Sequence, residues 1–457
     1  MSRQFNRTAA LAVMALAALV GNACAVGLLA TPESDLHDYP GIENTGPSEG
    51  PPYDFYDAAP PVASGGGTLT VPAYNSLPGA HAKLFLDFDG VNFGATQWAS
   101  RSPGAAPAYD IDGNPGGFSA EELSRIEQIW SRVAEAYSMF NINVTTVNPG
   151  NYNPKESAHL VITSDSTWYG AVGGVALSGG FRSAANMVQH TAWAFSDNLR
   201  NGEAKATADA VIHEAGHLFG LDHQAAFNEN GTRLPGARGG AYDDNNASET
   251  QAPNMGVAYY AGRGQWAIGA AGSNGFTLID ELNVIGGLGT FANDFGYAPD
   301  EPGVSFETAP LIQPVSAPMR GVIARNEDVD YYRFELERRS DVSLFVDVAP
   351  YGPTLDAKLQ IYSSDELLLY TDDPTLATSR GSLTAGFDGA LDAGVYYLAI
   401  ASHGGYAYDN GPHDRVLQDV GQYYLSGSIT AVAPEPAACV VAGLATLLTT
   451  CRRRRLV

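Results

Sequence analysis

The sequence has few cysteines and few basic residues. Its three cysteines all lie near the ends of the 457-residue chain, at Cys24, Cys439 and Cys451, so the long middle of the chain forms no disulfide. Lysine and arginine number 25 against 50 aspartate and glutamate, which gives a net charge of -25. This acid excess argues against nucleic acid as a partner, because phosphate contacts need a basic surface. It is typical of a soluble protein outside the cell.

The N-terminus has the three parts of a secretory signal. Two arginines provide a positive segment, residues 9–20 an apolar segment, and Ala23-Cys24-Ala25 a small-residue cleavage site. We therefore expect residues 1–25 to be a signal peptide and the protein to be exported. A lipoprotein cysteine at Cys24 is the alternative, although Gly21 stands where an aliphatic residue would be expected.

Five further segments differ in composition. Residues 26–80 are rich in proline, glycine, serine and acids without sustained periodicity, which predicts a disordered leader or propeptide. Regular apolar patterns then occupy 81–296 and 305–430, and a proline-, glycine- and acid-rich linker, 297–304, separates them. The hydrophobic content of 45% is ample for two or three buried cores. Residues 431–457 form a distinct tail.

The run HEAGHLFGLDH, residues 213–223, places three imidazoles and a carboxylate at a metal-binding spacing. In a helix, His213 and His217 lie on one face with Glu214 beside them. Gly220 can adopt the positive φ that ends a helix, and the turn brings His223 back as a third ligand. Three protein ligands leave the fourth position of a zinc ion open for water.

This pattern resembles the metzincin zinc peptidases, whose signature HExxHxxGxxH it matches at every fixed position. The resemblance implies that His213, His217 and His223 bind zinc and that Glu214 is the general base for hydrolysis of a peptide bond by metal-activated water. It also implies an α+β fold, in which a metzincin-like catalytic domain of a twisted mixed sheet and long helices occupies residues 81–296. Because the leader has no cysteine, a cysteine cannot block the zinc as it does in matrixins.

A second element of the resemblance follows the histidines. Ala252-Pro253-Asn254-Met255-Gly256 is similar to the turn that places a methionine beneath the zinc of metzincins, with a core methionine as the alternative for Met255. Several metzincin families carry a tyrosine two residues after this methionine, where Val257 stands here. Whether Tyr259 or Tyr260 assists catalysis therefore stays open.

Local patterns predict the elements around the motif. The glycine-rich segment 173–178 resembles the metzincin edge strand that pairs with an extended substrate, with a hairpin as the alternative. Ser119 and Glu122 form a capping box that opens a long amphipathic helix. Further helices are expected at 206–219 and 276–285, and strands at 83–88, 142–147 and 159–163.

The segment 305–430 changes to the short alternating runs of a β-sandwich. It resembles the bacterial pre-peptidase C-terminal domain through DVDYYRF at 328–334, LDAKL at 355–359 and GVYYL at 394–398. That family accompanies secreted proteases and has no catalytic role of its own. The resemblance therefore implies an all-β domain outside the active site.

The tail resembles a PEP-CTERM sorting signal. Pro434-Glu435-Pro436 precedes an apolar stretch at 437–450 and then four arginines, Arg452–Arg455. The resemblance implies transient membrane anchoring, removal by an exosortase-type enzyme, and a place on or outside the surface of a Gram-negative bacterium. The stretch is shorter than the roughly 20 residues of a spanning helix. A simple membrane anchor is the alternative.

Two functions are consistent with these features. The first is a secreted zinc endopeptidase that acts on proteins or peptides. The second is a surface or matrix adhesion protein that keeps a zinc-site scaffold without turnover. Asp110-Ile-Asp112-Gly-Asn114 and Asp243-Asp244-Asn245-Asn246 have the oxygen-rich composition of calcium loops but lack a complete EF-hand pattern, so ordinary turns are the simpler interpretation.

Overall fold

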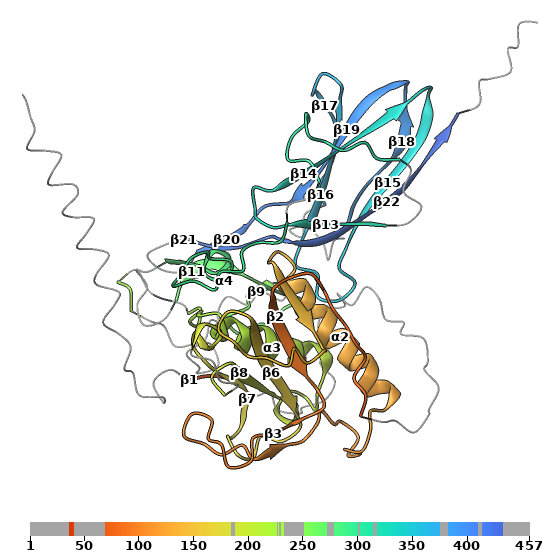
Figure 1. Cartoon of the computed structure of the whole chain (residues 1–457). Coiled ribbons are helices and arrows are strands. Elements are labelled where there is room, and N and C mark those ends of the chain that lie inside the picture. The colour runs from red at the N-terminus through yellow and green to blue at the C-terminus, as the bar shows by residue number, and fades with distance from the viewer. Residues whose placement is uncertain are drawn as a thin grey trace, which may run out of the picture.

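The computed structural model describes most of the chain between the leader and the tail (Figure 1). The described residues are 36–40, 69–183, 188–225, 227, 230–232, 251–271, 278–299, 302–313, 318–374, 383–409 and 414–432. The predicted signal peptide, most of the leader, the acidic loop at 243–246 and the sorting motif from Pro434 onward lie outside them. No helix among the described residues is long and apolar enough to cross a membrane.

The described residues are mostly β: 39% of them are strand and 14% helix, with three α-helices. The expected α+β class, with a metzincin-like domain of long helices, is therefore wrong. Within the described ranges, only α2 (Ala120–Ala136) and α3 (Ala204–Leu218) exceed two turns. The helix predicted at 276–285 is the strand β12 (Leu278–Asp280) followed by the short α4 (Glu281–Ile285). The 51 glycines and 27 prolines favour turns and short strands instead.

A six-stranded sheet forms the N-terminal part, in the order β1-β7-β8-β6-β2-β5. Strands β2, β5, β6 and β8 are parallel, whereas β7 runs antiparallel to β8, and β1 runs antiparallel to β7. The strands are β1 (Leu36–Pro40), β2 (Ala82–Asp87), β5 (Ile142–Thr145), β6 (Ser157–Thr163), β7 (Val172–Leu177) and β8 (Thr191–Phe195). The strands predicted at 83–88, 142–147 and 159–163 are thus confirmed within a few residues. The segment 173–178 is also a strand, β7, but it lies between β1 and β8 and not at the edge that was expected.

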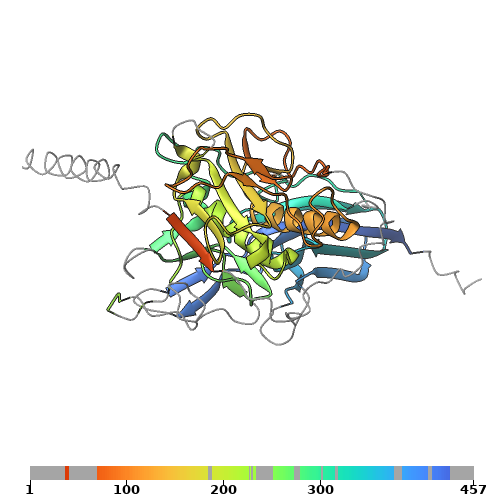
Figure 2. The same cartoon turned by 90° about the horizontal axis from the view of Figure 1, so that it is seen from below.

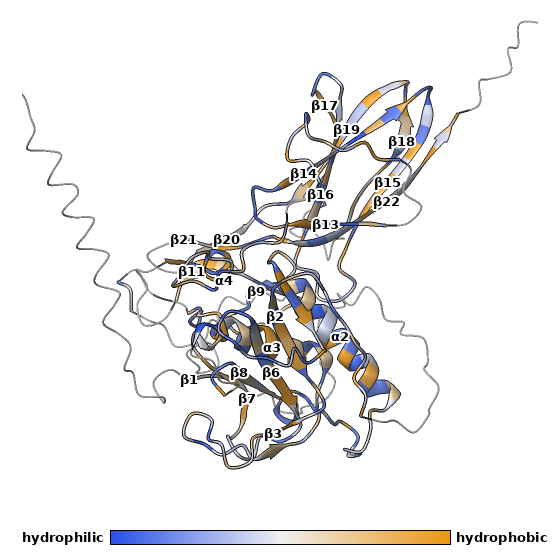
Figure 3. Cartoon of the chain, in the orientation of Figure 1, coloured by the Kyte–Doolittle hydropathy of each residue, from blue (hydrophilic) through white to orange (hydrophobic). Residues whose placement is uncertain are grey.

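Helices α2 and α3 pack together on one face of this sheet (Figure 1). The capping box at Ser119 and Glu122 is confirmed as the start of α2, whose apolar side faces the core (Figure 3). Helix α3 is buried on nearly all sides, as a helix without a polar face must be. Their contact includes a hydrogen bond from the Tyr137 hydroxyl to the Ile212 carbonyl, 2.9 Å long. The helix that carries His213 and His217 is therefore held inside the core.

Short elements complete this part of the chain. The two-residue strands β3 (Val91–Asn92) and β4 (Ala105–Ala106) pair with each other, and the parallel strands β9 (Gln251–Pro253) and β10 (Arg263–Gln265) flank the methionine segment. Two 3-10 turns follow β7 and β8, at Gly180–Arg182 and Ser196–Asn198.

The expected β-sandwich is present in the C-terminal part. Its two four-stranded sheets have the orders β13-β22-β15-β18 and β14-β19-β16-β17, and they enclose one apolar core. Their strands are β13 (Met319–Ile323), β14 (Val329–Leu336), β15 (Ser340–Val348), β16 (Ala357–Ser363), β17 (Leu368–Asp372), β18 (Ala385–Leu391), β19 (Gly394–Ser402) and β22 (Gly421–Ala431). The alternating burial of β14 and β15 is the period-2 pattern that the sequence shows.

A third sheet joins the two parts of the chain. It has the order β12-β11-β21-β20 and pairs β11 (Ala267–Ala270) with β12 and with β21 (Asp414–Leu417), next to β20 (Tyr406–Asp409). Strands from both sides of the expected linker therefore share one hydrogen-bonded ladder. The indole N–H of Trp266 donates a hydrogen bond to the Ala136 carbonyl at the end of α2.

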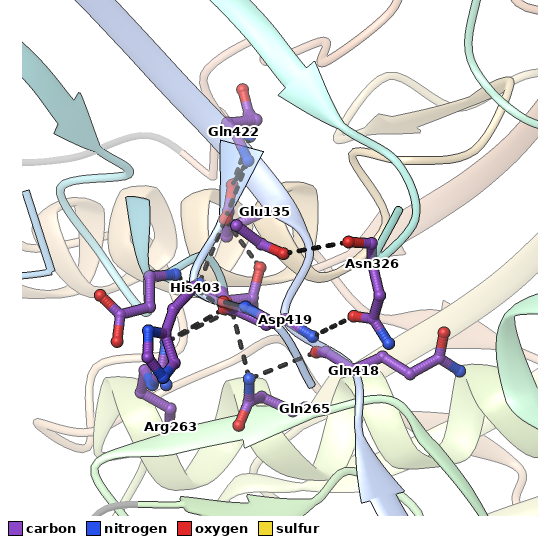
Figure 4. A network of polar contacts seen from close by, with 12 residues as sticks. Glu135, Arg263, Gln265, Asn326, His403, Gln418, Asp419 and Gln422 are labelled. Carbon is purple, nitrogen blue, oxygen red and sulfur yellow. Dashed lines mark hydrogen bonds and ion pairs between the residues drawn. The ribbon is translucent and has the colours of Figure 1, made fainter. Parts of the chain in front are cut away.

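A buried polar network lies at the same junction (Figure 4). The carboxylate of Glu135, at the end of α2, accepts hydrogen bonds from the backbone and side chain of Thr354 and from the backbone and side chain of Gln422. Burial raises the pKa of Glu135. Because a buried carboxyl group is costly without partners, these donors tie α2 to the sandwich.

Candidate metal centre

Three histidine rings converge at the end of α3. The Nε2 atom of His217 lies 3.0 Å from the Nε2 atom of His213 and 3.0 Å from that of His223. His213 and His217 are fully buried, and His223 is partly exposed. They are one of two groups of potential ligands that the described residues contain. The structure therefore brings together the three histidines that the sequence predicts as zinc ligands.

Backbone carbonyls fix the orientation of the two helical rings. The Nδ1 atom of His213 lies 2.8 Å from the Asn254 carbonyl oxygen, and the Nδ1 atom of His217 lies 2.8 Å from the Leu221 carbonyl oxygen. A carbonyl only accepts, so both Nδ1 atoms carry the proton, and both Nε2 atoms present a lone pair. Such contacts orient metal-binding imidazoles and increase their basicity.

The turn after α3 brings the third histidine to this point. Gly220 has a φ of 99°, as the motif predicts. The Gly220 amide donates to the His217 carbonyl and the Leu221 amide to the Gly216 carbonyl, which is the Schellman pattern of helix ends. The same turn aims the Leu221 carbonyl at His217. Helix termination and ligand orientation therefore depend on one glycine.

Met255 lies in a tight turn that packs against α3 at Gly216. It is fully buried, and a β-carbon added to Gly216 would lie 2.5 Å from its sulfur, so the thioether packs on α3 between His213 and His217. The Gly256 amide closes the turn on the Pro253 carbonyl, and the Met255 carbonyl accepts from the Gln224 amide. The turn thus touches the helix and the segment that carries the third histidine.

Glu214 is fully buried, and its carboxylate lies against β7. A β-carbon on Gly174 would lie 2.6 Å from Glu214 Cγ and 2.8 Å from its Oε1 atom. Only a glycine at this place in β7 leaves room for the carboxylate. The candidate general base therefore lies between the helix that carries His213 and the strand expected to pair with substrate.

These residues fit a zinc ion. Two nitrogens that bind the same zinc at about 2.1 Å are at most about 4.2 Å apart, and the two Nε2 pairs meet that limit. In neutral rings with protonated Nδ1 atoms, the Nε2 lone pairs of His213 and His217 repel each other, and a shared cation removes this repulsion. Neutral imidazole is a preferred zinc ligand.

No protein-family model and no curated protein sequence matches the chain. Among solved structures, it is similar to the pre-peptidase C-terminal domain of a collagenase from Bacillus anthracis, at 17% identity and a TM-score of 0.19, covering 29% of this chain and 98% of that one. It is also similar to PliG of Aeromonas hydrophila, a periplasmic inhibitor of g-type lysozyme, at 13% identity and a TM-score of 0.17, covering 26% and 96%. One neighbour thus bears the name of the family that residues 305–430 resemble.

The two tyrosines after the methionine turn differ in their surroundings. Tyr259 is buried in the core, and Tyr260 is 38% exposed, with the guanidinium of Arg200 5.8 Å above its ring. Their rings meet edge to face. A catalytic role for either tyrosine stays untested.

The second group of potential ligands is Asp110, Asp112 and Glu122. One oxygen of Asp110 accepts from the amides of Gly113 and Asn114, and Glu122 accepts from Ser119 and Ile111, so the carboxylates close a turn and cap α2. This is the ordinary turn that the sequence favours at 110–114. Calcium binding stays an untested prediction.

A buried hydrogen bond next to His223, between Gln224 and Glu281, was not predicted from the sequence. The side chain of Gln224 donates to Glu281, whose other oxygen accepts from the Ala267 amide. Burial raises the pKa of Glu281 to about 8. No local pattern marks this glutamate, because it begins a five-residue helix and its partners lie 14 and 57 residues away.

Proposed function

We propose that the protein is a zinc-dependent peptidase that hydrolyses peptide bonds in extended protein segments. The observation that carries the proposal is the convergence of three Nε2 atoms beside a buried glutamate. His213, His217 and His223 would hold the ion, and the carbonyls of Asn254 and Leu221 keep two of these rings in the required tautomer.

A zinc ion held by neutral imidazoles supplies Lewis acidity, which polarises a carbonyl group and makes water more acidic. Glu214 would accept the proton of the attacking water at its carboxylate and pass it to the leaving amine nitrogen. Its burial against Gly174 keeps bulk water away from this carboxylate. No covalent intermediate with the protein is required, because water is the nucleophile.

The side of β7 that faces away from β8 supplies the reason for a peptide substrate. β7 runs past Glu214 and is antiparallel to β8, so a strand on its other side, where β1 lies in the folded chain, runs beside the carboxylate. Extended peptides bind sheet edges of this kind through main-chain hydrogen bonds. The resemblance of the motif to the metzincin signature is consistent with this chemistry, although the fold class expected from it is wrong.

The sequence signals complete the proposal. The predicted signal peptide, the acidic composition and the predicted sorting tail favour an enzyme that acts outside a bacterial cell, with an exosortase-type enzyme as a processing partner. Residues 305–430 would then be the accessory domain of such an enzyme.

The test measures bound zinc and hydrolysis on the same preparations. We expect about one zinc per chain, caseinolysis that a chelator abolishes and zinc restores, and loss of both metal and activity in His217→Ala. A protein that holds zinc but cleaves neither casein nor a peptide library would contradict the proposal and favour the adhesion alternative.

A further inference from the structure

Residues 36–40 lie on the open edge of the sheet beside the candidate site. β1 pairs antiparallel with β7, from Leu36 opposite Leu177 to Pro40 opposite Val172. It is the outermost strand of the six, and Figure 2 shows it in red at the margin of the sheet. If β1 left, β7 would present unpaired backbone groups, which is the arrangement that accepts another strand.

β1 passes next to the candidate general base. Tyr39 lies opposite Gly174, and Gly174 is the residue against which the Glu214 carboxylate packs. β1 also contacts α3, the helix that carries Glu214 and two of the histidines. The backbone at Tyr39 therefore lies where a peptide presented to Glu214 would run.

Two strands cannot pair with the same edge of β7. We infer that residues 36–40 compete within the molecule with extended peptide substrates, so that the chain is latent while its leader is attached and docked. That β1 excludes a peptide substrate rests on the proposed function. That β1 occupies the side of β7 rests on the strand pairing alone.

Covalent attachment explains how so short a strand holds the edge. The covalent connection through residues 41–68 gives the tethered strand an effective concentration of the order of 1 mM, which a free pentapeptide does not have. If β1 is docked in about nine of ten molecules, the apparent affinity for substrate falls about tenfold. Cleavage of the chain between Pro40 and Leu69 would release the strand and activate the enzyme.

The test uses the full chain with proline introduced into β1. Proline has no amide hydrogen, and the amides of neighbouring residues in a strand point in opposite directions, so His37→Pro or Asp38→Pro must remove a hydrogen bond to β7. Glu43→Pro is the matched control, because it also replaces an acid by proline but lies beyond the strand. Hydrogen exchange of the amides at 172–177 measures directly whether β7 is hydrogen-bonded to β1.

We expect faster exchange at 172–177 in at least one strand variant, a roughly tenfold lower KM for a quenched peptide and an unchanged kcat, with Glu43→Pro like the parent. A labelled peptide of residues 34–42 should bind the strand variant and not the parent. Unchanged exchange at 172–177 in both strand variants would overturn the inference. Faster exchange there with an unchanged KM would overturn it as well. If no variant hydrolyses the substrate, the proposed function fails, and exchange and peptide binding still decide whether β1 occupies the edge.

Discussion

Gly216 and Met255 are packed so closely that the helix surface between His213 and His217 has no room for a β-carbon. An added β-carbon would lie 2.5 Å from the Met255 sulfur. The adjacent Asn254 carbonyl accepts from His213, and the Met255 carbonyl accepts from Gln224. One turn therefore supports the ligands from below through packing and hydrogen bonds.

Gly216→Ala should separate this turn from α3. Overpacking of this kind costs about 1–3 kcal/mol of folding free energy, and we expect weaker zinc binding because the Asn254 carbonyl moves with the turn. Chemical unfolding and competition with a zinc-binding dye measure the two effects. Gly79→Ala is the control, since nothing lies within 4 Å of a β-carbon there. Equal folding free energies and equal zinc affinities of Gly216→Ala and Gly79→Ala would contradict the packing argument.

Gly174→Ala should affect turnover more than metal binding. The added carbon would lie 2.6 Å from Glu214 Cγ and 2.8 Å from the Trp193 carbonyl oxygen, and none of the three nearest atoms belongs to a histidine. Because a misplacement of about 1 Å in a catalytic group can cost roughly 100-fold, we expect kcat to fall at least about tenfold with zinc content unchanged. Steady-state kinetics and metal analysis check this. An unchanged kcat would show that the carboxylate does not need its present position.

Stability should decrease as the pH rises from about 4.5 to 8. Burial raises the pKa of Glu281 to about 8 in the folded protein, so the folded state keeps a proton that the unfolded chain loses near pH 4.5. The free energy of unfolding therefore falls by up to about 1.4 kcal/mol per pH unit over this window. Burial also raises the pKa of Asp419, to about 7, despite the nearby Arg263. Glu281→Gln should therefore reduce the slope of melting temperature against pH without abolishing it; an identical slope would refute the assignment.

The parts of the site that local geometry determines were predictable. The four-residue spacing of His213 and His217 and the positive φ at Gly220 follow from the geometry of a helix and its end, and the structure has both. The capping box at Ser119 is equally local.

The parts that depend on long-range packing were not predictable. Glu214 needs Gly174, which lies 40 residues earlier and carries no sequence signal for that contact. Glu135 bonds to residues 219 and 287 positions away, so the junction with the sandwich is visible only after folding. The leader was expected to be disordered, and composition gave no sign that residues 36–40 pair with β7. The fold class failed for the same reason, since strand pairing is non-local.

Glu214→Gln tests the central claim most directly. If the carboxylate transfers the proton, this variant should keep full zinc, because the three histidines remain, and should lose roughly 100-fold or more in kcat. Metal content and peptide hydrolysis should be measured on one preparation, beside His217→Ala, in which both should be lost. A Glu214→Gln protein with full zinc and undiminished hydrolysis would contradict the account.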